Sequence, residues 1–215
     1  MKKINLPTKI TILRIVISTL LILAIIVFYL LDEYKVLLVN SYNLNFCGIK
    51  INLLMLIFWI VFLVASLTDF LDGYLARKNN EVTDLGKFLD PLADKMLINS
   101  IMIFLCFNFI SISDELTFPW FCVVLMTIRD LIVDGLRFMA ASKNVTIAAN
   151  MWGKAKTVLQ MIAISLVMLN GFPFSFIDYA WIKYLHITDF FCYLATIVSL
   201  IGGYVYLKDN RKVLE

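Results

Sequence analysis

Six long apolar stretches constrain the fold of this 215-residue chain more than any other feature. A helix needs about 20 predominantly apolar residues to cross the hydrocarbon core of a bilayer. Helices are expected in lipid because every backbone polar group must find its partner within the segment. The sequence therefore predicts an all-α integral membrane protein with one domain over residues 1–215. The predicted spans are Ile10–Leu31, Ile51–Leu75, Lys87–Ile110, Phe118–Ala141, Ala155–Leu169 (or from an earlier start near Ala148) and Tyr184–Leu207.

The composition supports this interpretation and excludes two broad classes of protein. Hydrophobic residues make up 61% of the chain and charged residues 16%. A soluble domain carries about 25% charged residues, so an ordinary soluble enzyme is excluded. Disorder is excluded because it requires low hydrophobicity and high net charge. The net charge of +3 gives no indication of a nucleic-acid partner, and none is expected.

Lysine and arginine are distributed unevenly between the predicted loops. Fourteen of the 19 lie in or beside the N-terminal segment, the second and fourth loops and the C-terminal tail. Only Lys35, Lys50 and Lys183 lie in the alternate loops, and Lys95 and Arg129 lie inside helices. Because cytoplasmic loops of membrane proteins are enriched in these residues, both termini are predicted to be cytoplasmic.

Four aspartates lie where the second and third predicted helices face each other: Asp69, Asp72, Asp90 and Asp94. An acid at the centre of a membrane helix costs about 2.5–3.5 kcal/mol on insertion scales. Water, cations or both must therefore compensate these carboxylates. Alternatively, the acids line an ion path or pair with basic residues.

Spacing groups the first two acids with residues suited to binding a phosphate. Asp69 and Asp72 are i and i+3, so they share a helix face. Gly73, Ala76 and Arg77 fall in the same broad arc at about 100° per residue. Two of these residues have almost no side chain, which leaves room for a bulky ligand, and the guanidinium can hold a phosphate by a bidentate contact.

The other two acids share a face of the next helix, where Asp90 and Asp94 are i and i+4. Gly86 lies one turn before Asp90. Pro91 is best tolerated in a first helical turn, which predicts that this helix begins close to Asp84–Phe88. The short link can then fold the two helices into a hairpin that brings all four acids together.

Converging carboxylates of this density favour a divalent metal site. Hard oxygen ligands suit Mg²⁺ or Mn²⁺ better than zinc or copper. Two such cations would balance four negative charges, and two-metal sites promote phosphoryl displacement. A multipass transporter with an acidic ion path is the alternative from another class of protein.

The pattern D-x2-D-G-x2-A-R-x8-G-x3-D-x3-D, from Asp69 to Asp94, resembles the signature of the CDP-alcohol phosphatidyltransferases in all eight of its fixed positions. Three further segments resemble the members of that family that use glycerol phosphate. They are Asn5–Thr8 with Thr11 and Arg14, the stretch Arg129–Arg137, and Gly153–Thr157. Within the second segment, Asp130 departs from the glutamate expected in those members.

The resemblance implies six transmembrane helices with an N-terminal interfacial segment, membrane lipids as surroundings, a homodimer and an active site that opens to the cytoplasm. The implied reaction transfers a phosphatidyl group from CDP-diacylglycerol to sn-glycerol 3-phosphate and releases CMP. The implied metal ligands are Asp69, Asp72, Asp90 and Asp94, and Asp94 is also the general base for the glycerol hydroxyl. The implied CDP-binding wall consists of Gly73, Ala76, Arg77 and Gly86.

The acceptor is a dianion, so its pocket is expected to be basic. Arg129 lies about 11 residues into the fourth predicted span, roughly 16 Å along the helix, where an arginine is a functional candidate. Alternatively, the helical spacing allows Arg137 to pair with Asp130 and Asp134, and the lysines to act as membrane anchors. Inositol phosphate and phosphatidylglycerol remain alternative acceptors, whereas the basic cluster argues against serine. The candidate acceptor-phosphate residues are Arg129, Arg137, Lys154 and Lys156.

Overall fold

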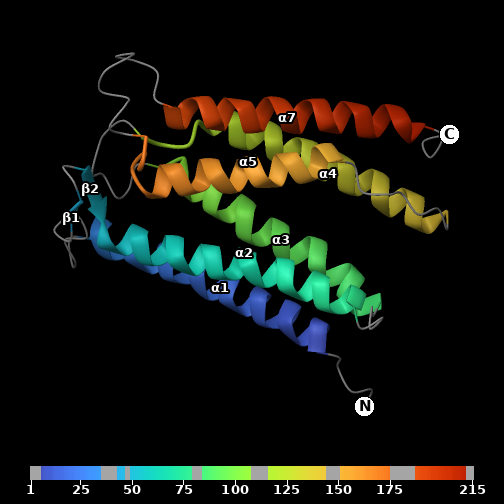
Figure 1. The fold of residues 1–215 in the computed structure, drawn as a ribbon, viewed down its shortest axis with the longest axis horizontal. Helices are drawn as coiled ribbons and strands as arrows, with labels where there is room; N and C mark the ends of the chain where they lie inside the picture. Colours follow the sequence, from blue (N-terminus) through green and yellow to red (C-terminus); the bar gives the residue numbers. More distant parts are fainter. Residues whose placement is uncertain are drawn as a thin grey trace. The chain divides into compact units, whose positions relative to one another are not determined.

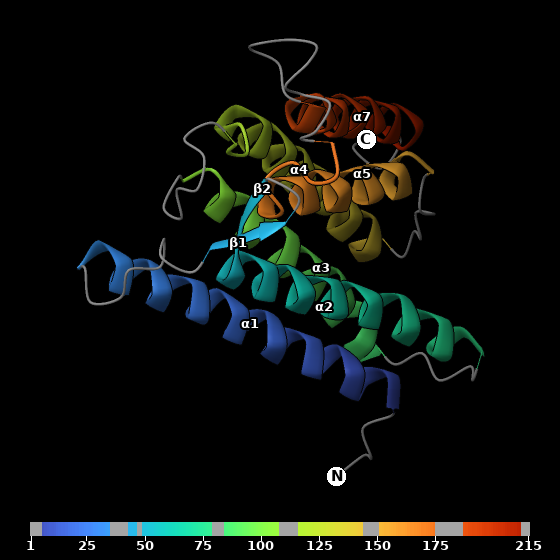
Figure 2. The ribbon, with the colours of Figure 1, turned by 60° about the vertical axis from the view of Figure 1, so that its left-hand side comes forward.

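The computed structural model of the chain describes residues 6–34, 43–46, 49–78, 84–107, 116–143, 151–174 and 187–211. These residues form two compact units, which are described separately (Figures 1 and 2). Unit 1 holds α1 (Leu6–Glu33), β1 (Asn43–Phe46), β2 (Ile49–Asn52), α2 (Leu53–Lys78) and almost all of α3 (Asp84–Leu105). Unit 2 holds α4 (Trp120–Ser142), α5 (Met151–Met168) except its last residue, and α7 (Ile187–Asp209).

A helix occupies each of the six predicted spans, so the mainly helical fold is confirmed. The fifth helix begins at Met151, which agrees with the earlier of the two starts considered. The prediction was wrong at the start of α2. Ile51 and Asn52, which were expected to begin the helix, belong to the strand Ile49–Asn52, and α2 begins at Leu53, so the described fold is not purely α-helical.

Two helical stretches are long and apolar enough to cross a membrane, counting only helices whose side chains the structure describes. They are Thr8–Leu31, with a mean hydropathy of 2.8, and Ile187–Asp209, with 1.8. Leu53–Thr68 is apolar but shorter. Six membrane-spanning helices therefore stay a prediction, as does the interfacial segment, because residues 1–5 lie outside the described ranges.

A polar cap explains why the chain changes from strand to helix at residue 53. β1 and β2 pair antiparallel, with Asn43 opposite Asn52. The buried Asn52 side chain accepts a hydrogen bond of 2.9 Å from the backbone N–H of Leu54. An asparagine in this position satisfies one of the free N–H groups at a helix N-terminus.

In unit 1, α1 packs against α2, and the two helices run in opposite directions (Figure 1). Their apolar contact includes Phe28 and Phe58, whose ring centroids lie 5.9 Å apart. Along α2, Phe58, Phe62 and Ala65 are all buried and follow each other at helical spacing. This spacing defines one buried face of α2 against the rest of the unit.

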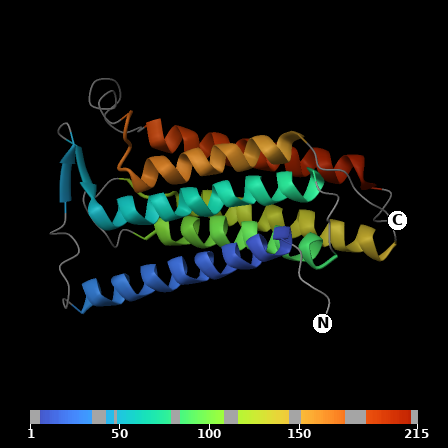
Figure 3. The ribbon, with the colours of Figure 1, turned by 60° about the horizontal axis from the view of Figure 1, so that its bottom comes forward.

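The predicted hairpin of α2 and α3 is confirmed at the level of the backbone. Residues 79–83 separate the two helices, so the end of α2 lies close to the start of α3. Figure 3 shows the N-terminus of α1 at this same end of the unit. The start of α3 at Asp84 agrees with prediction, but the argument from Pro91 was wrong, because this proline lies beyond the first helical turn.

In unit 2, α4 packs against α7 through a small apolar cluster. Val133, Leu136 and Ala140 of α4 are buried with Tyr206 of α7, and Leu207 is packed against them. This contact fixes the face of α4 that carries Arg129, because Val133 and Leu136 follow that residue at i+4 and i+7.

Candidate functional site

The buried face of α1 changes from apolar to polar along its length. Leu21 and Ile25 are buried near the middle of the helix, and the next buried positions toward the N-terminus are Ser18, Arg14 and Thr11. Arg14 is only 1% exposed. A buried cation in an apolar helix requires compensating partners, so this end of unit 1 must be polar.

The buried faces of α2 and α3 lead to the same end of the unit. On α2, the spacing of Phe62 and Ala65 continues to positions 69 and 72. On α3, Ile98 and Ile101 are buried, and Asp94 precedes them on the same helical face. Asp94 itself is half-buried. The polar buried residues of α1, the acidic positions of α2 and Asp94 of α3 thus lie toward one end of unit 1.

The contact between Phe28 and Phe58 sets the level of Arg14 along α2. Arg14 lies 14 residues before Phe28, and position 72 lies 14 residues after Phe58. Because α1 and α2 run antiparallel, both positions are two heptads from the same contact and therefore at one level. The backbone thus brings a buried arginine and the acidic motif to neighbouring turns.

The structure does not describe the side chains of most residues that were predicted to bind the metals and CDP. The backbone places two of the acids at the end of α2 and two in α3, which is the arrangement that the motif predicts. Their oxygen donors fit a hard divalent cation. Metal binding and CDP binding stay predictions for Asp69, Asp72, Gly73, Ala76, Arg77, Gly86 and Asp90.

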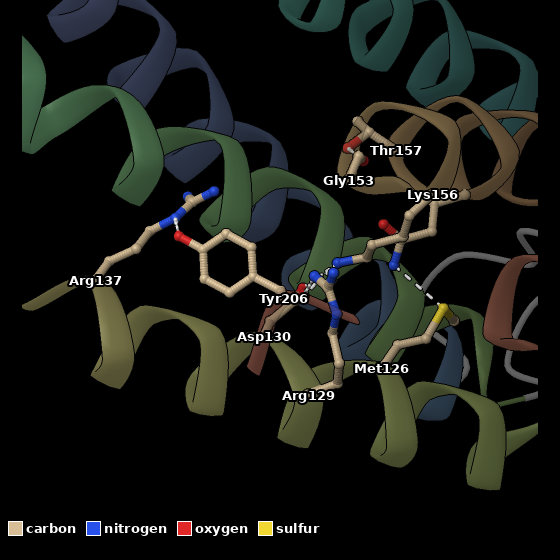
Figure 4. Close-up of polar contacts among 9 residues, drawn as sticks. Met126, Arg129, Asp130, Arg137, Gly153, Lys156, Thr157 and Tyr206 are labelled. Atoms are coloured by element: carbon tan, nitrogen blue, oxygen red, sulfur yellow. Dashed lines mark hydrogen bonds and ion pairs between the residues drawn. The ribbon is translucent and has the colours of Figure 1, made fainter. Parts of the chain in front are cut away.

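The predicted acceptor residues lie in unit 2, where two of them meet at one carboxylate (Figure 4). Asp130 of α4 is 4% exposed. Its Oδ1 accepts a hydrogen bond of 3.0 Å from Arg129 Nη1. Lys156 of α5, also buried, donates to both oxygens of the same carboxylate. The sequence left open a pairing of Arg137 with Asp130, whereas the structure pairs Asp130 with Arg129 and Lys156.

This cluster carries a net positive charge. Arg129 and Lys156 contribute two positive charges and Asp130 contributes one negative charge, which leaves a formal charge of +1. The Nε of Arg129 is buried and makes no hydrogen bond to any residue that the structure describes. A buried guanidinium edge with surplus positive charge is suited to binding an oxyanion through two parallel N–H groups.

The other two predicted acceptor residues lie apart from this cluster. Arg137 is on α4, two turns beyond Arg129, and its Nε donates a hydrogen bond of 3.1 Å to the Tyr206 hydroxyl. Its guanidinium also lies 5.5 Å from the centroid of that ring. Lys154 is exposed on α5. The structure thus brings Arg129 and Lys156 together, and holds Arg137 against α7.

Sequence reasoning missed three residues of α7 that surround the basic side chains. Tyr206 is buried and receives Arg137. Gly202 and Gly203 are buried against Trp152 and Arg129. The adjacent glycines were the available signal, because small residues in membrane helices mark close contacts between helices. The partner that makes such a contact cannot be read from one helix alone.

The described parts of the chain are those of a helical protein with apolar helices, an acidic motif across a helical hairpin and a buried basic cluster. The model of one family, CDP-alcohol phosphatidyltransferase, matches residues 4–201. The chain therefore belongs to the CDP-alcohol phosphatidyltransferase family. Members of this family generally use divalent metal ions. Together with the two apolar helices, membership of this family indicates a membrane protein.

Three curated relatives are named CDP-diacylglycerol–glycerol-3-phosphate 3-phosphatidyltransferase. The Bacillus subtilis (strain 168) protein is 37% identical over 156 residues, which cover 73% of this chain and 74% of the relative. The Mycoplasma pneumoniae protein is 38% identical over 163 residues, covering 73% and 67%. The Rickettsia felis protein is 34% identical over 209 residues, covering 97% and 96%.

Proposed function

We propose that this chain transfers a phosphatidyl group from CDP-diacylglycerol to sn-glycerol 3-phosphate. The acceptor hydroxyl attacks the phosphorus that carries the diacylglycerol, the bond from that phosphorus to the bridging oxygen breaks, and CMP leaves with this oxygen. The products are phosphatidylglycerophosphate and CMP. The observation that carries the proposal is the relative with this activity in its name, which is 34% identical over 97% of the chain.

On the donor side, we assign the nucleotide and the metals to the polar end of unit 1. Asp69, Asp72 and Asp90 would hold Mg²⁺ or Mn²⁺, with Asp94 as a further ligand. Gly73, Ala76, Arg77 and Gly86 would form the wall for CDP. Two bound cations would supply charge neutralisation for the diphosphate. The change from apolar to polar residues on the buried face of α1 and the half-buried Asp94 of α3 support this assignment.

Asp94 takes the role of general base in this scheme. A base must lie within hydrogen-bond reach of the hydroxyl whose proton it accepts. Asp94 is half-buried, and the residues that follow it on the same face of α3, Ile98 and Ile101, are buried. It therefore lies where an apolar interior ends, which is a suitable place for a carboxylate that exchanges a proton with substrate.

On the acceptor side, Arg129 binds the phosphate of glycerol 3-phosphate directly. Lys156 acts on the same site through Asp130, since its amine donates to both oxygens of that carboxylate, which in turn accepts from Arg129. Arg137 and Lys154 contribute positive charge nearer the ends of their helices. The surplus charge of the cluster of Arg129, Asp130 and Lys156 supports this arrangement, because a dianionic ligand would compensate it.

We further propose six membrane-spanning helices, cytoplasmic termini, a cytoplasmic opening of the active site, a homodimer and a single catalytic domain. Exposed apolar side chains support the additional spans. Leu131 of α4 is 67% exposed, Val158 of α5 57% and Ile103 of α3 48%. Such surfaces are stable in contact with lipid and unfavourable in water. The distribution of lysine and arginine supports the orientation.

A panel of acceptors tests the proposed function. The purified protein is supplied with CDP-diacylglycerol and, in parallel reactions, glycerol 3-phosphate, inositol phosphate, serine or phosphatidylglycerol. We expect CMP release and a phosphatidyl product with glycerol 3-phosphate, at a rate well above that with the other three. A faster reaction with inositol phosphate would assign the chain to another acceptor.

A further inference from the structure

The side chain of Arg129 lies directly against the backbone of α7. A Cβ atom built on Gly203 would lie 2.7 Å from Arg129 Cγ and 3.0 Å from its Nε. Cγ is close to the root of the side chain, so bending the far end of the arginine cannot relieve such a clash. Arg129 can adopt its present rotamer only because residue 203 has no side chain.

The same arginine is held at its far end by Asp130. The 3.0 Å contact from Nη1 to Asp130 Oδ1 fixes one side of the guanidinium, and Gly203 accommodates the stem. Within the described part of the chain, Nε keeps no hydrogen-bond partner. Two independent contacts therefore determine the direction of the guanidinium and leave one N–H directed at no described protein group.

Neighbouring glycines differ from Gly203 in what they accommodate. A Cβ on Gly202 would lie 2.7 Å from Trp152 Cβ, 3.4 Å from Arg129 Nη2 and 3.6 Å from the Trp152 backbone carbonyl carbon. Its closest contact is therefore with α5, and this glycine chiefly allows α5 and α7 to approach. Gly135 of α4 has open space around the same built atom. At Gly203 the three nearest atoms all belong to Arg129. Gly203 also lies outside the family match, which ends at residue 201.

We infer that Gly203 is a positioning residue for the acceptor-phosphate site. Its missing side chain lets Arg129 extend along α7 with its guanidinium fixed between α7 and Asp130. An alanine at 203 forces Arg129 into another rotamer and moves the guanidinium away from the phosphate. The inference rests on the proposed function, because it assigns Arg129 to the acceptor.

The test compares Gly203→Ala with Gly135→Ala, a matched change at a helical glycine that has open space. Initial rates of CMP release are measured against glycerol 3-phosphate concentration, and thermal unfolding is followed in detergent. We expect Gly203→Ala to raise KM for glycerol 3-phosphate about 10-fold with a smaller change in kcat, the loss typical of one hydrogen bond to a charged group. Gly135→Ala should leave KM unchanged.

A double variant separates positioning from general damage to packing. Arg129→Ala alone should raise KM about 10- to 100-fold. Adding Gly203→Ala to it should change KM no further, because both changes act on one side chain. The double variant should also unfold at a higher temperature than Gly203→Ala alone, since removing the arginine side chain relieves the clash. This comparison remains informative if Gly203→Ala by itself folds poorly.

The outcomes distinguish this inference from the proposed function. An unchanged KM in Arg129→Ala would remove Arg129 from the acceptor site, and the role of Gly203 with it. A raised KM in Arg129→Ala together with a wild-type KM in Gly203→Ala would overturn the positioning role alone. Additive effects in the double variant, or equal instability with and without Arg129, would also overturn it.

Discussion

Replacing Asp94 by asparagine is expected to reduce turnover by about 100- to 10,000-fold, the usual contribution of general acid–base catalysis. The amide keeps the shape of the carboxylate but cannot accept the proton of the acceptor hydroxyl. Because Asp94 is half-buried rather than part of the packed interior, the variant should fold and unfold as the wild type does. CMP release at saturating concentrations of both substrates measures the effect.

Two controls make this measurement specific to Asp94. Asp209→Asn makes the same chemical change at an exposed site at the end of α7, and it should leave turnover unchanged. A titration with Mg²⁺ separates the roles of base and ligand. The half-saturating metal concentration stays constant if Asp94 acts only as base and rises if it also binds the metal. Turnover close to that of the wild type would remove Asp94 as the base.

The second large effect is expected for Lys156→Met, which keeps the unbranched apolar stem of the side chain and removes its charged amine. Lys156 is buried and donates to both oxygens of the buried Asp130. Breaking a buried ion pair from one side costs about 3–5 kcal/mol. Arg129 still compensates Asp130, so we expect the lower end, about 3 kcal/mol. This corresponds to a decrease of about 6–12 °C in unfolding temperature.

Matched variants show whether the lower unfolding temperature comes from the Asp130 carboxylate that has lost its lysine partner. Lys154→Met removes an exposed charge from the same helix and should leave the unfolding temperature unchanged. Adding Asp130→Asn to Lys156→Met removes the stranded charge as well and should restore part of the lost stability. If Lys156→Met unfolds like the wild type, the contact with Asp130 does not stabilise the fold.

The sequence predicts the helices and the acidic motif well, because both follow from local pattern. Long apolar runs indicate helices in lipid, and the spacing from Asp69 to Asp94 fits a helical hairpin with these acids at one end. The small sheet of β1 and β2 was missed, since each strand has only four residues and borders an apolar run. Asn52 marks the start of α2 through its hydrogen bond with the Leu54 N–H, and the sequence alone does not reveal that bond.

Contacts between helices could not be predicted in the same way. Spacing within one helix allowed Arg137 to pair with Asp130 and Asp134, but Asp130 accepts from Arg129 and from Lys156, which lies 26 residues away on α5. Arg137 contacts Tyr206, which lies 69 residues away on α7. Such pairs depend on how the helices rotate and pack, and a single sequence does not contain that information.

We propose above that this chain makes phosphatidylglycerophosphate by a metal-dependent transfer. The most direct test measures CMP release by the purified protein with CDP-diacylglycerol and glycerol 3-phosphate, with and without EDTA. We expect equal amounts of CMP and phosphatidylglycerophosphate, no release when either substrate is left out, loss of activity with EDTA and recovery with excess Mg²⁺ or Mn²⁺. Absence of CMP release under all these conditions, or release that is indifferent to EDTA, would contradict it.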